Sequence, residues 1–269
     1  MREAVVAGRF YPGSAEDLKN AIGRLVDTSV KKEEALGVVM PHAGYMYSGR
    51  VAAVTISAVN LKSTYIILGP NHTGAGTAFS LMSTEDWQTP LGKVEVDKKL
   101  AATILQHTRF IKEDKSAHLE EHSIEVEIPF LQYLSKEAFK IVPMVVASGD
   151  LKALKGVGRE LAEAIKIENS QGQVLIIASS DMTHYESQQS AEQKDHEAIR
   201  AILKLDEDLL FEKIRDLDIS MCGYAPTIIM LTAVKALGAK TARMVKYQTS
   251  GDASGDYSAV VGYAGIIIK

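Results

Sequence analysis

The sequence has little of three things: cysteine, long apolar runs and clustered positive charge. Its 269 residues include a single cysteine, so no disulfide can form within the chain. No apolar stretch approaches the roughly 20 residues that a membrane-spanning helix requires. The N-terminal stretch also lacks the apolar core of a signal peptide. We therefore expect a cytoplasmic protein that has no membrane partner.

Positive charge is scattered along the chain. Lysine and arginine number 30 against 34 acidic residues, which gives a formal net charge of -4. A surface that binds nucleic acid usually shows as a basic patch or stripe, so nucleic acid is not an expected partner. The remaining composition, 46% hydrophobic and 24% charged, is that of an ordinary globular protein. No linker-like segment divides the chain, so we expect a single domain over residues 1–269.

Short runs rich in valine and isoleucine alternate with helical stretches. Runs that are apolar throughout are typical of strands buried on both faces of a parallel sheet. The alternation predicts an α/β fold, a layered sandwich around a largely parallel central sheet. The predicted strands are 36–40, 64–68, 140–146, 174–178 and 259–268. The predicted helices are 14–26, 51–59, 98–106, 124–134, 151–167, 190–204 and 225–237.

Ionisable side chains follow directly after three of the predicted strands. His42 follows the first strand, His72 the second, and Asp181 with His184 the fourth. In open α/β sheets, ligands bind beyond the carboxyl ends of the strands, where loops converge. One such histidine is often a core residue bonded to a backbone carbonyl. Three strands that carry such groups to one edge favour a shared site.

Cys222 stands just before the helix predicted at 225–237, which Pro226 could start. A helix N-terminus stabilises the thiolate and lowers the thiol pKa, and the thiolate is the form that binds metal. We therefore favour a ligating or reactive role for Cys222 over core packing. Together with neutral imidazoles, the commonest protein ligands of metals, it indicates a metal site.

A second constellation has the spacing H-x-x-E-H, with His118, Glu121 and His122. This is the inverted zinc-protease motif. On one helix the two histidines would lie one turn apart and could share a zinc, with Glu121 as general base. The alternative is a helix with a solvated acidic face. The motif also needs a third, distant ligand that the sequence does not identify.

Two further features are candidates for parts of a pocket. The glycine-rich segment 69–76 follows a strand, so its backbone amides could form an anion-binding nest, although it lacks the lysine of a phosphate loop. The tyrosines Tyr45, Tyr47, Tyr185 and Tyr224 lie near the histidine segments and could line a pocket. Tyrosines near strand ends are also common as half-buried packing residues.

The order of these segments resembles the Memo family. The resemblance is carried by AGRFYPG, PHAGYMYSG, GPNHTG, EHSIEVEIPFLQ, SSDMTHY, CGYAP and DYSAVVGYAG, which together span residues 7–265. It implies an α/β fold similar to that of the class III extradiol dioxygenases, non-haem iron enzymes that cleave catechol rings. It makes the zinc-protease match coincidental, because the family pattern begins at Glu121 and does not need His118.

The resemblance also assigns roles to residues. It implies that His42, His72 and Cys222 hold a metal ion. His184 takes the place of the dioxygenase base, with Asp181 beside it to orient it. The same resemblance places His122 near this pocket.

The implied ligand set differs from that of the dioxygenases, which hold iron with two histidines and a carboxylate. A thiolate is a softer donor that suits copper or zinc as well as iron. We therefore expect a metal-dependent, redox or dioxygenase-like enzyme that acts on a small molecule, with iron as the first choice of metal. The family also includes a vertebrate member regarded as a phosphopeptide-binding adaptor. A non-catalytic module that binds a peptide or an anion in the same pocket is therefore the second hypothesis, although its motifs hold no arginine cluster.

Overall fold

A mixed eleven-stranded sheet forms the centre of the protein, in a computed structural model that describes residues 1–269. The main strand order is β10-β11-β1-β8-β2-β7-β3-β6. The central strands run parallel, and nearly all of their residues are buried, which explains their unbroken apolar runs. These strands are β1 (Gly37–Met40), β8 (Val174–Ser179), β2 (Thr64–Pro70) and β7 (Lys140–Val146).

Antiparallel strands flank this parallel centre. β11 (Val260–Ile268) pairs with β1 and with β10 (Ala242–Thr249), and β3 (Phe79–Leu81) pairs with β7. The sequence predicted β11 but not β10, because β10 is only half-buried and carries a mixed polar sequence. The remaining strands are β4 (Trp87–Thr89), β5 (Gly92–Val96), β6 (Lys112–Glu113) and β9 (His184–Glu186).

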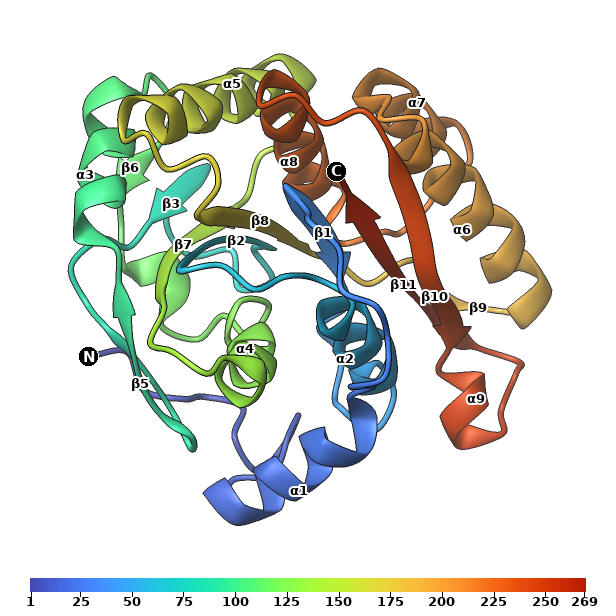
Figure 1. Ribbon diagram of the computed structural model, residues 1–269. Coiled ribbons are helices and arrows are strands. Elements are labelled where there is room, and N and C mark those ends of the chain that lie inside the picture. The colour runs from blue at the N-terminus through green and yellow to red at the C-terminus, as the bar shows by residue number, and fades with distance from the viewer.

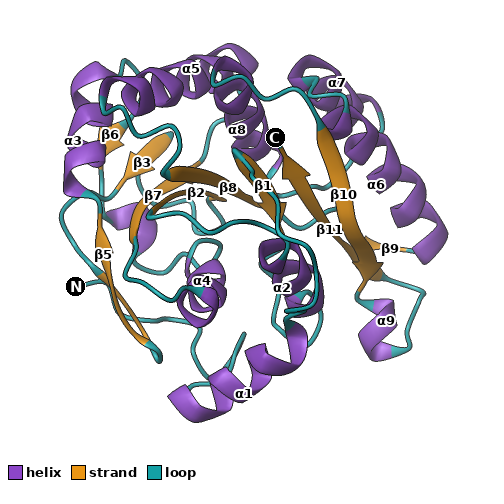
Figure 2. Ribbon diagram, viewed as in Figure 1, coloured by secondary structure: helices purple, strands orange, loops and turns teal.

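Helices cover both faces of the sheet, as Figure 1 shows. One layer holds α1, α2 and α4, and the other holds α3, α5 and α8, with α6 and α7 beside it toward β10 and β11 (Figures 1 and 2). The predicted layered α/β fold is therefore confirmed. The helices are α1 (Ala15–Leu25), α2 (Gly49–Ser57), α3 (Lys98–His107), α4 (Ile128–Leu134), α5 (Leu151–Ile167), α6 (Gln188–Leu203), α7 (Glu207–Asp216), α8 (Tyr224–Ala236) and α9 (Gly251–Ser254), with two 3₁₀ turns, η1 (Ser116–His118) and η2 (Glu125–Glu127).

The predicted helices are all present, with ends shifted by a few residues. The helix α1 begins as expected, because the Ser14 hydroxyl accepts a hydrogen bond from the Asp17 amide at 3.1 Å. The stretch 124–134 opens with the 3₁₀ turn η2 before α4. The sequence did not predict α7. No helix has the length and apolar character that crossing a membrane requires.

The strand order places the candidate loops at one edge. β1, β8 and β2 are consecutive neighbours in the sheet, with Met40 opposite Ser179 and Leu68 opposite Ala178. Their carboxyl ends therefore lie side by side. The segments that carry His42, Asp181 and His72 leave the sheet at the same edge, as the sequence predicted.

Close packing between β11 and α2 gives a test of this arrangement. A Cβ atom added at Gly265 would lie 1.8 Å from the Thr55 hydroxyl oxygen, which is itself held by a bond to the Val51 carbonyl. We expect Gly265→Ala to lower the free energy of unfolding by about 1–3 kcal/mol, because the helix must move off the sheet. Urea unfolding measures this change. Gly172→Ala, which meets open space, should leave stability unchanged, and equal losses in both variants would contradict the packing.

Candidate metal centre

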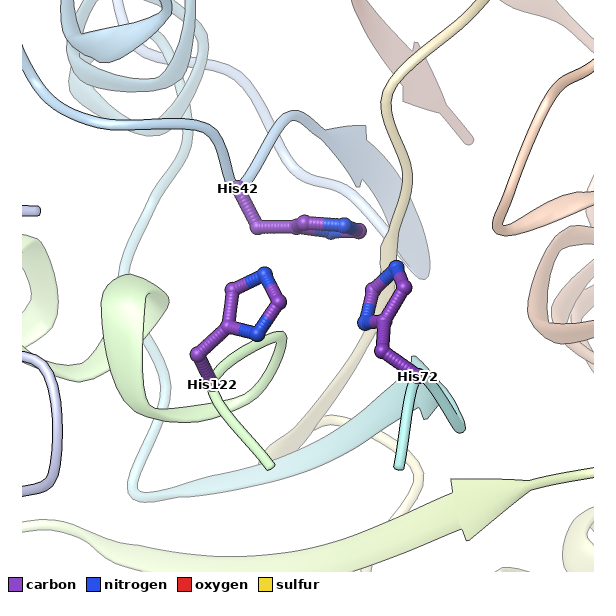
Figure 3. Close-up of side chains that lie close together, drawn as sticks. All are labelled: His42, His72 and His122. Carbon is purple, nitrogen blue, oxygen red and sulfur yellow. The ribbon is translucent and has the colours of Figure 1, made fainter. Parts of the chain in front are cut away.

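Three histidines converge at the carboxyl edge of the sheet. His42, His72 and His122 each offer a ring nitrogen, and these atoms lie within 4.8 Å of one another. Figure 3 shows the rings directed toward a common centre. The centroid of His72 lies 4.6 Å from that of His122, and His42 stands edge-on to both rings. Imidazole donors of this kind suit iron, copper or zinc.

Hydrogen bonds set the direction in which two of these rings offer a lone pair. The Nδ1 atom of His42 lies 2.8 Å from the Ser179 hydroxyl, and that of His72 lies 2.9 Å from a carboxylate oxygen of Glu121. Because the carboxylate only accepts, His72 must donate its Nδ1 proton to it. In the neutral ring its Nε2 atom then carries no proton, and its lone pair can bind a metal ion. Partners of this kind fix the tautomer and orientation of metal-binding histidines.

The Glu121 carboxylate joins two of the ligand segments. It accepts hydrogen bonds from the backbone amides of His72, His122 and Ser123, at 2.5, 2.9 and 2.9 Å. Burial acts to raise the pKa of Glu121, but the bonds from His72 and Ser123, with the charge that His72 carries when it is protonated, lower it to about 2. Glu121 is therefore ionised across the physiological range and is only 1% exposed.

A buried arginine holds the segment that carries His122. Arg2 donates to the backbone carbonyls of His118 at 3.1 Å and Glu121 at 2.6 Å, and it pairs with the Glu125 carboxylate. Both side chains of this ion pair are buried. The segment between His118 and Glu125 is thus fixed at several points by one side chain from the start of the chain.

The structure does not support the zinc-protease alternative, in agreement with the family resemblance. His118 ends the 3₁₀ turn η1, and His122 lies in the loop that follows, so the two do not share a helical face. His118 is buried, donates from Nε2 to the Ser80 carbonyl at 3.0 Å, and lies edge-on to the Trp87 ring. Burial lowers the pKa of His118 to about 4, which makes it a neutral core residue.

Asp181 and His184 make different contacts from those expected. An Asp181 carboxylate oxygen accepts bonds from the amides of His42 at 2.9 Å and Ala43 at 3.3 Å. Burial raises the pKa of Asp181 to about 6. The Nδ1 atom of His184 donates to the Ser220 carbonyl at 3.0 Å, and Ser220 thus does the orienting that we had expected of Asp181. Asp181 instead fixes the backbone that presents His42.

Cys222 lies beside the histidine cluster but is not part of it. Its sulfur is 3.4 Å from Nε2 of His42 and accepts from the Asp181 amide at 3.3 Å. Burial, followed by the charge of Asp181, raises the pKa of the Cys222 thiol well above its ordinary value. The expectation that the start of α8 lowers this pKa is wrong, because burial outweighs the helix terminus. The role of Cys222 as a ligand stays a prediction.

A cavity of about 600 Å³ opens onto the histidines. His184 and Tyr185 line it, and Tyr185 has a left-handed backbone with φ of 58° and a side chain 79% exposed. Tyr45 and Tyr224 do not line it: Tyr45 is buried with its hydroxyl bonded to the Val126 carbonyl. The lining residues are Phe10, His42, Ala43, Gly44, Tyr47, His72, His122, Asp181, His184, Tyr185, Ser250, Ser254, Asp256, Ala259, Val261 and Tyr263.

Several lining residues were not predicted from the sequence. Phe10 lies 4.8 Å from the His122 ring, centroid to centroid, although its segment AGRFYPG entered the sequence analysis only as part of the family resemblance. Val261 and Tyr263 line the cavity from one face of β11, and Ala259 lines it from the position just before the strand. Their alternation along a strand was visible in the sequence. The direction in which that face points depends on the pairing of β11 with β1.

Comparisons with known proteins agree with this architecture. Residues 2–267 match the family described as Memo-like protein. A MEMO1 family protein of Methanosarcina mazei is 45% identical, covering 100% of this chain and 99% of its own. One from Methanopyrus kandleri is 42% identical with the same coverage. The crystal structure of an uncharacterized protein from Escherichia coli K12 has a TM-score of 0.55 and 15% identity, covering 86% of this chain and 98% of its own, which shows likeness of fold alone.

The buried Glu121 carboxylate gives a pH-dependent prediction for the metal-free protein. Because its folded pKa is about 2, against a usual value above 4, its ionised form adds about 3 kcal/mol of stability at pH 7. This contribution is lost as the pH falls from about 4.5 toward 2. We expect Glu121→Gln to be less stable than the native protein at pH 7, with a difference that shrinks below pH 4.

Chemical denaturation at a series of pH values measures this difference. Glu120→Gln is the matched control, because Glu120 is the exposed neighbour. A Glu121→Gln deficit that stays constant from pH 7 to pH 3 would show that the carboxylate is not held in its ionised form.

Proposed function

The chain belongs to the Memo-like protein family, and on that premise we propose that it is a metal-dependent enzyme. His42, His72 and His122 would hold the ion, with iron as the first choice and copper or zinc as alternatives. The reaction would be an oxidation of a small molecule, of the dioxygenase-like kind. One observation carries the proposal: three imidazoles meet at the wall of a cavity, and two of them have their Nδ1 atoms bonded to partners outside the cluster.

The donor set fits such an ion. Three neutral imidazoles leave coordination positions for a substrate, which is the arrangement of catalytic rather than structural sites. Cys222 is proposed as an additional donor, since its sulfur and Nε2 of His42 are close enough to contact one ion. Iron or copper bound here would supply Lewis-acid and one-electron redox chemistry to a molecule in the cavity.

The other cavity residues would prepare the substrate. Because Nδ1 of His184 donates to the Ser220 carbonyl, its Nε2 atom is available to accept a proton from a substrate hydroxyl. Asp181 holds the backbone of His42 in place. Phe10 lies against the His122 ring.

The alternative of an anion-binding module has less support. The amides of Thr73 and Gly74 already donate to the Asn71 side chain, and that of Ala75 donates to the Thr73 hydroxyl. These three amides are therefore not free to bind an anion. No lysine or arginine lines the cavity, whereas phosphate recognition usually depends on arginine.

Metal content is the direct test of the proposal. Protein purified without air should contain about one equivalent of iron, or of copper, by elemental analysis and spin-resonance spectroscopy. We expect His42→Ala and His122→Ala to lose it, because each removes one of three donors. Cys222→Ala should keep the metal with lower affinity and an altered spectrum.

The control for this experiment is His196→Ala, since His196 lies on α6 outside the cavity lining and its ring nitrogen bonds to the Glu192 carbonyl. Native protein that takes up no metal under reducing, metal-supplemented conditions would refute the proposed function. An unchanged spectrum and affinity in Cys222→Ala would remove the sulfur from the ligand set.

The role of His184 makes a separate prediction. His184→Ala should retain the metal but lose about 10²- to 10⁴-fold in turnover, because it removes the group that accepts the substrate proton. Oxygen consumption with a panel of hydroxylated aromatic compounds measures turnover, and elemental analysis measures the metal. Loss of the metal in this variant would instead make His184 a ligand.

A further inference from the structure

One tyrosine hydroxyl that faces the cavity makes no hydrogen bond to a protein group. Tyr11, Tyr45, Tyr65 and Tyr263 are the buried tyrosines, with exposures of 3, 5, 0 and 2%. The first three hydroxyls bond to a carboxylate, a backbone carbonyl and a backbone amide. The Tyr263 side chain lines the cavity, and its hydroxyl makes no hydrogen bond to any protein group. The hydroxyl oxygen itself is open to the cavity, so it is free to bond to water or to a ligand there.

The wall that carries this hydroxyl runs from the rim of the cavity to its interior. Along β11 and the residue before it, Ala259 is exposed, Val261 is half-buried and Tyr263 is buried. Tyr263 therefore lies at the inner end, where the charge of Asp181 adds to the effect of burial in raising the pKa of the Tyr263 phenol. The phenol keeps its proton and faces the cavity as a hydrogen-bond donor.

The rim of the cavity carries negative charge. Asp256 lines it and is exposed, and one of its carboxylate oxygens accepts bonds from the Ser258 amide at 2.9 Å and hydroxyl at 2.7 Å. These bonds lower the pKa of Asp256, so it is ionised at neutral pH. No lysine or arginine lines the cavity to balance it. A metal ion held by the histidines would add positive charge only at the inner end.

Apolar and aromatic side chains also line the cavity. Phe10, Tyr47, Tyr185 and Val261 all line the cavity. A volume of about 600 Å³ is ample for a small molecule with one ring. The cavity thus offers a donor at its inner end, aromatic walls, and a carboxylate at its rim.

We propose that the cavity binds a small molecule with three features. An oxygen at its inner end accepts a hydrogen bond from Tyr263, a flat apolar body lies along the aromatic walls, and a neutral or cationic group lies beside Asp256. The substrate class is therefore a ring hydroxyl compound without negative charge at the far end, and phosphorylated or carboxylated molecules are disfavoured. This inference rests on the proposed function in placing the oxygen beside the metal.

Three phenols that differ mainly in charge test the proposal: tyramine, 4-ethylphenol and 4-hydroxyphenylacetate. Calorimetric titration into the full chain at low ionic strength, with and without bound metal, should rank tyramine tightest and the carboxylate at least fivefold weaker than 4-ethylphenol. Asp256→Asn should remove the preference for tyramine over 4-ethylphenol, because the rim charge is lost. Tyr263→Phe should weaken 4-ethylphenol about 3- to 10-fold.

Thermal unfolding separates a binding role of Tyr263 from a structural one. Tyr263→Phe should not lower the Tm, because its hydroxyl has no protein partner, whereas Tyr11→Phe should lower it by breaking the bond to Glu125. Tyr257→Phe is the control for binding, since Tyr257 is 49% exposed and lies outside the lining. A Tm loss in Tyr263→Phe as large as that in Tyr11→Phe would overturn the proposal.

Comparison of the protein with and without bound metal distinguishes the proposed function from the inference on the ligand. Tightest binding of 4-hydroxyphenylacetate, no binding of any probe, or affinities unaffected by Tyr263→Phe would overturn the inference on the ligand. The expected ranking in a protein that takes up no metal would support this inference and refute the proposed function. Metal uptake with the reversed ranking of the three phenols would support the proposed function and refute the inference on the ligand.

Discussion

The buried ion pair between Arg2 and Glu125 is the interaction on which the candidate site depends most. Removing two charges from water costs several kcal/mol each, and this cost is recovered only when every donor and acceptor has a partner. Here Arg2 also reaches two backbone carbonyls, while Glu125 accepts from the Val5 and Val6 amides and the Tyr11 hydroxyl. The pair therefore fastens the first residues of the chain to the loop that presents His122.

The parallel sheet supplies the rest of the geometry. β1 and β2 end at the same edge and bring His42 and His72 together, but His122 comes from a loop between β6 and α4 that the sheet does not position. Glu121 makes the connection, because it binds the amides of both His72 and His122. The three ring nitrogens are thus brought together by hydrogen bonds within the protein, so an ion would meet a site that is already organised.

The sequence predicted the layered fold and the strand ends because both follow from local patterns. Apolar runs define the strands, and parallel strands place His42, His72 and Asp181 at one edge. His122 was predicted as a pocket residue but not as a member of the cluster, since its position depends on Arg2, far away in the sequence. The pKa of Cys222 was predicted in the wrong direction, because the start of α8 is visible in the sequence and burial is not. Tyr45 was misplaced for a similar reason: its partners, the Phe130 ring and the Val126 carbonyl, lie in a distant segment.

The left-handed backbone at Tyr185 has a consequence for how stable this fold can become. A tyrosine with positive φ costs about 1 kcal/mol or more relative to a relaxed conformation, and a glycine there would avoid that cost. The side chain recovers little of it by packing, since most of its surface is in solvent. This strained residue lies in β9, directly after His184, which lines the cavity. A glycine at position 185 would therefore relieve backbone strain, but it would remove a side chain that lines the cavity.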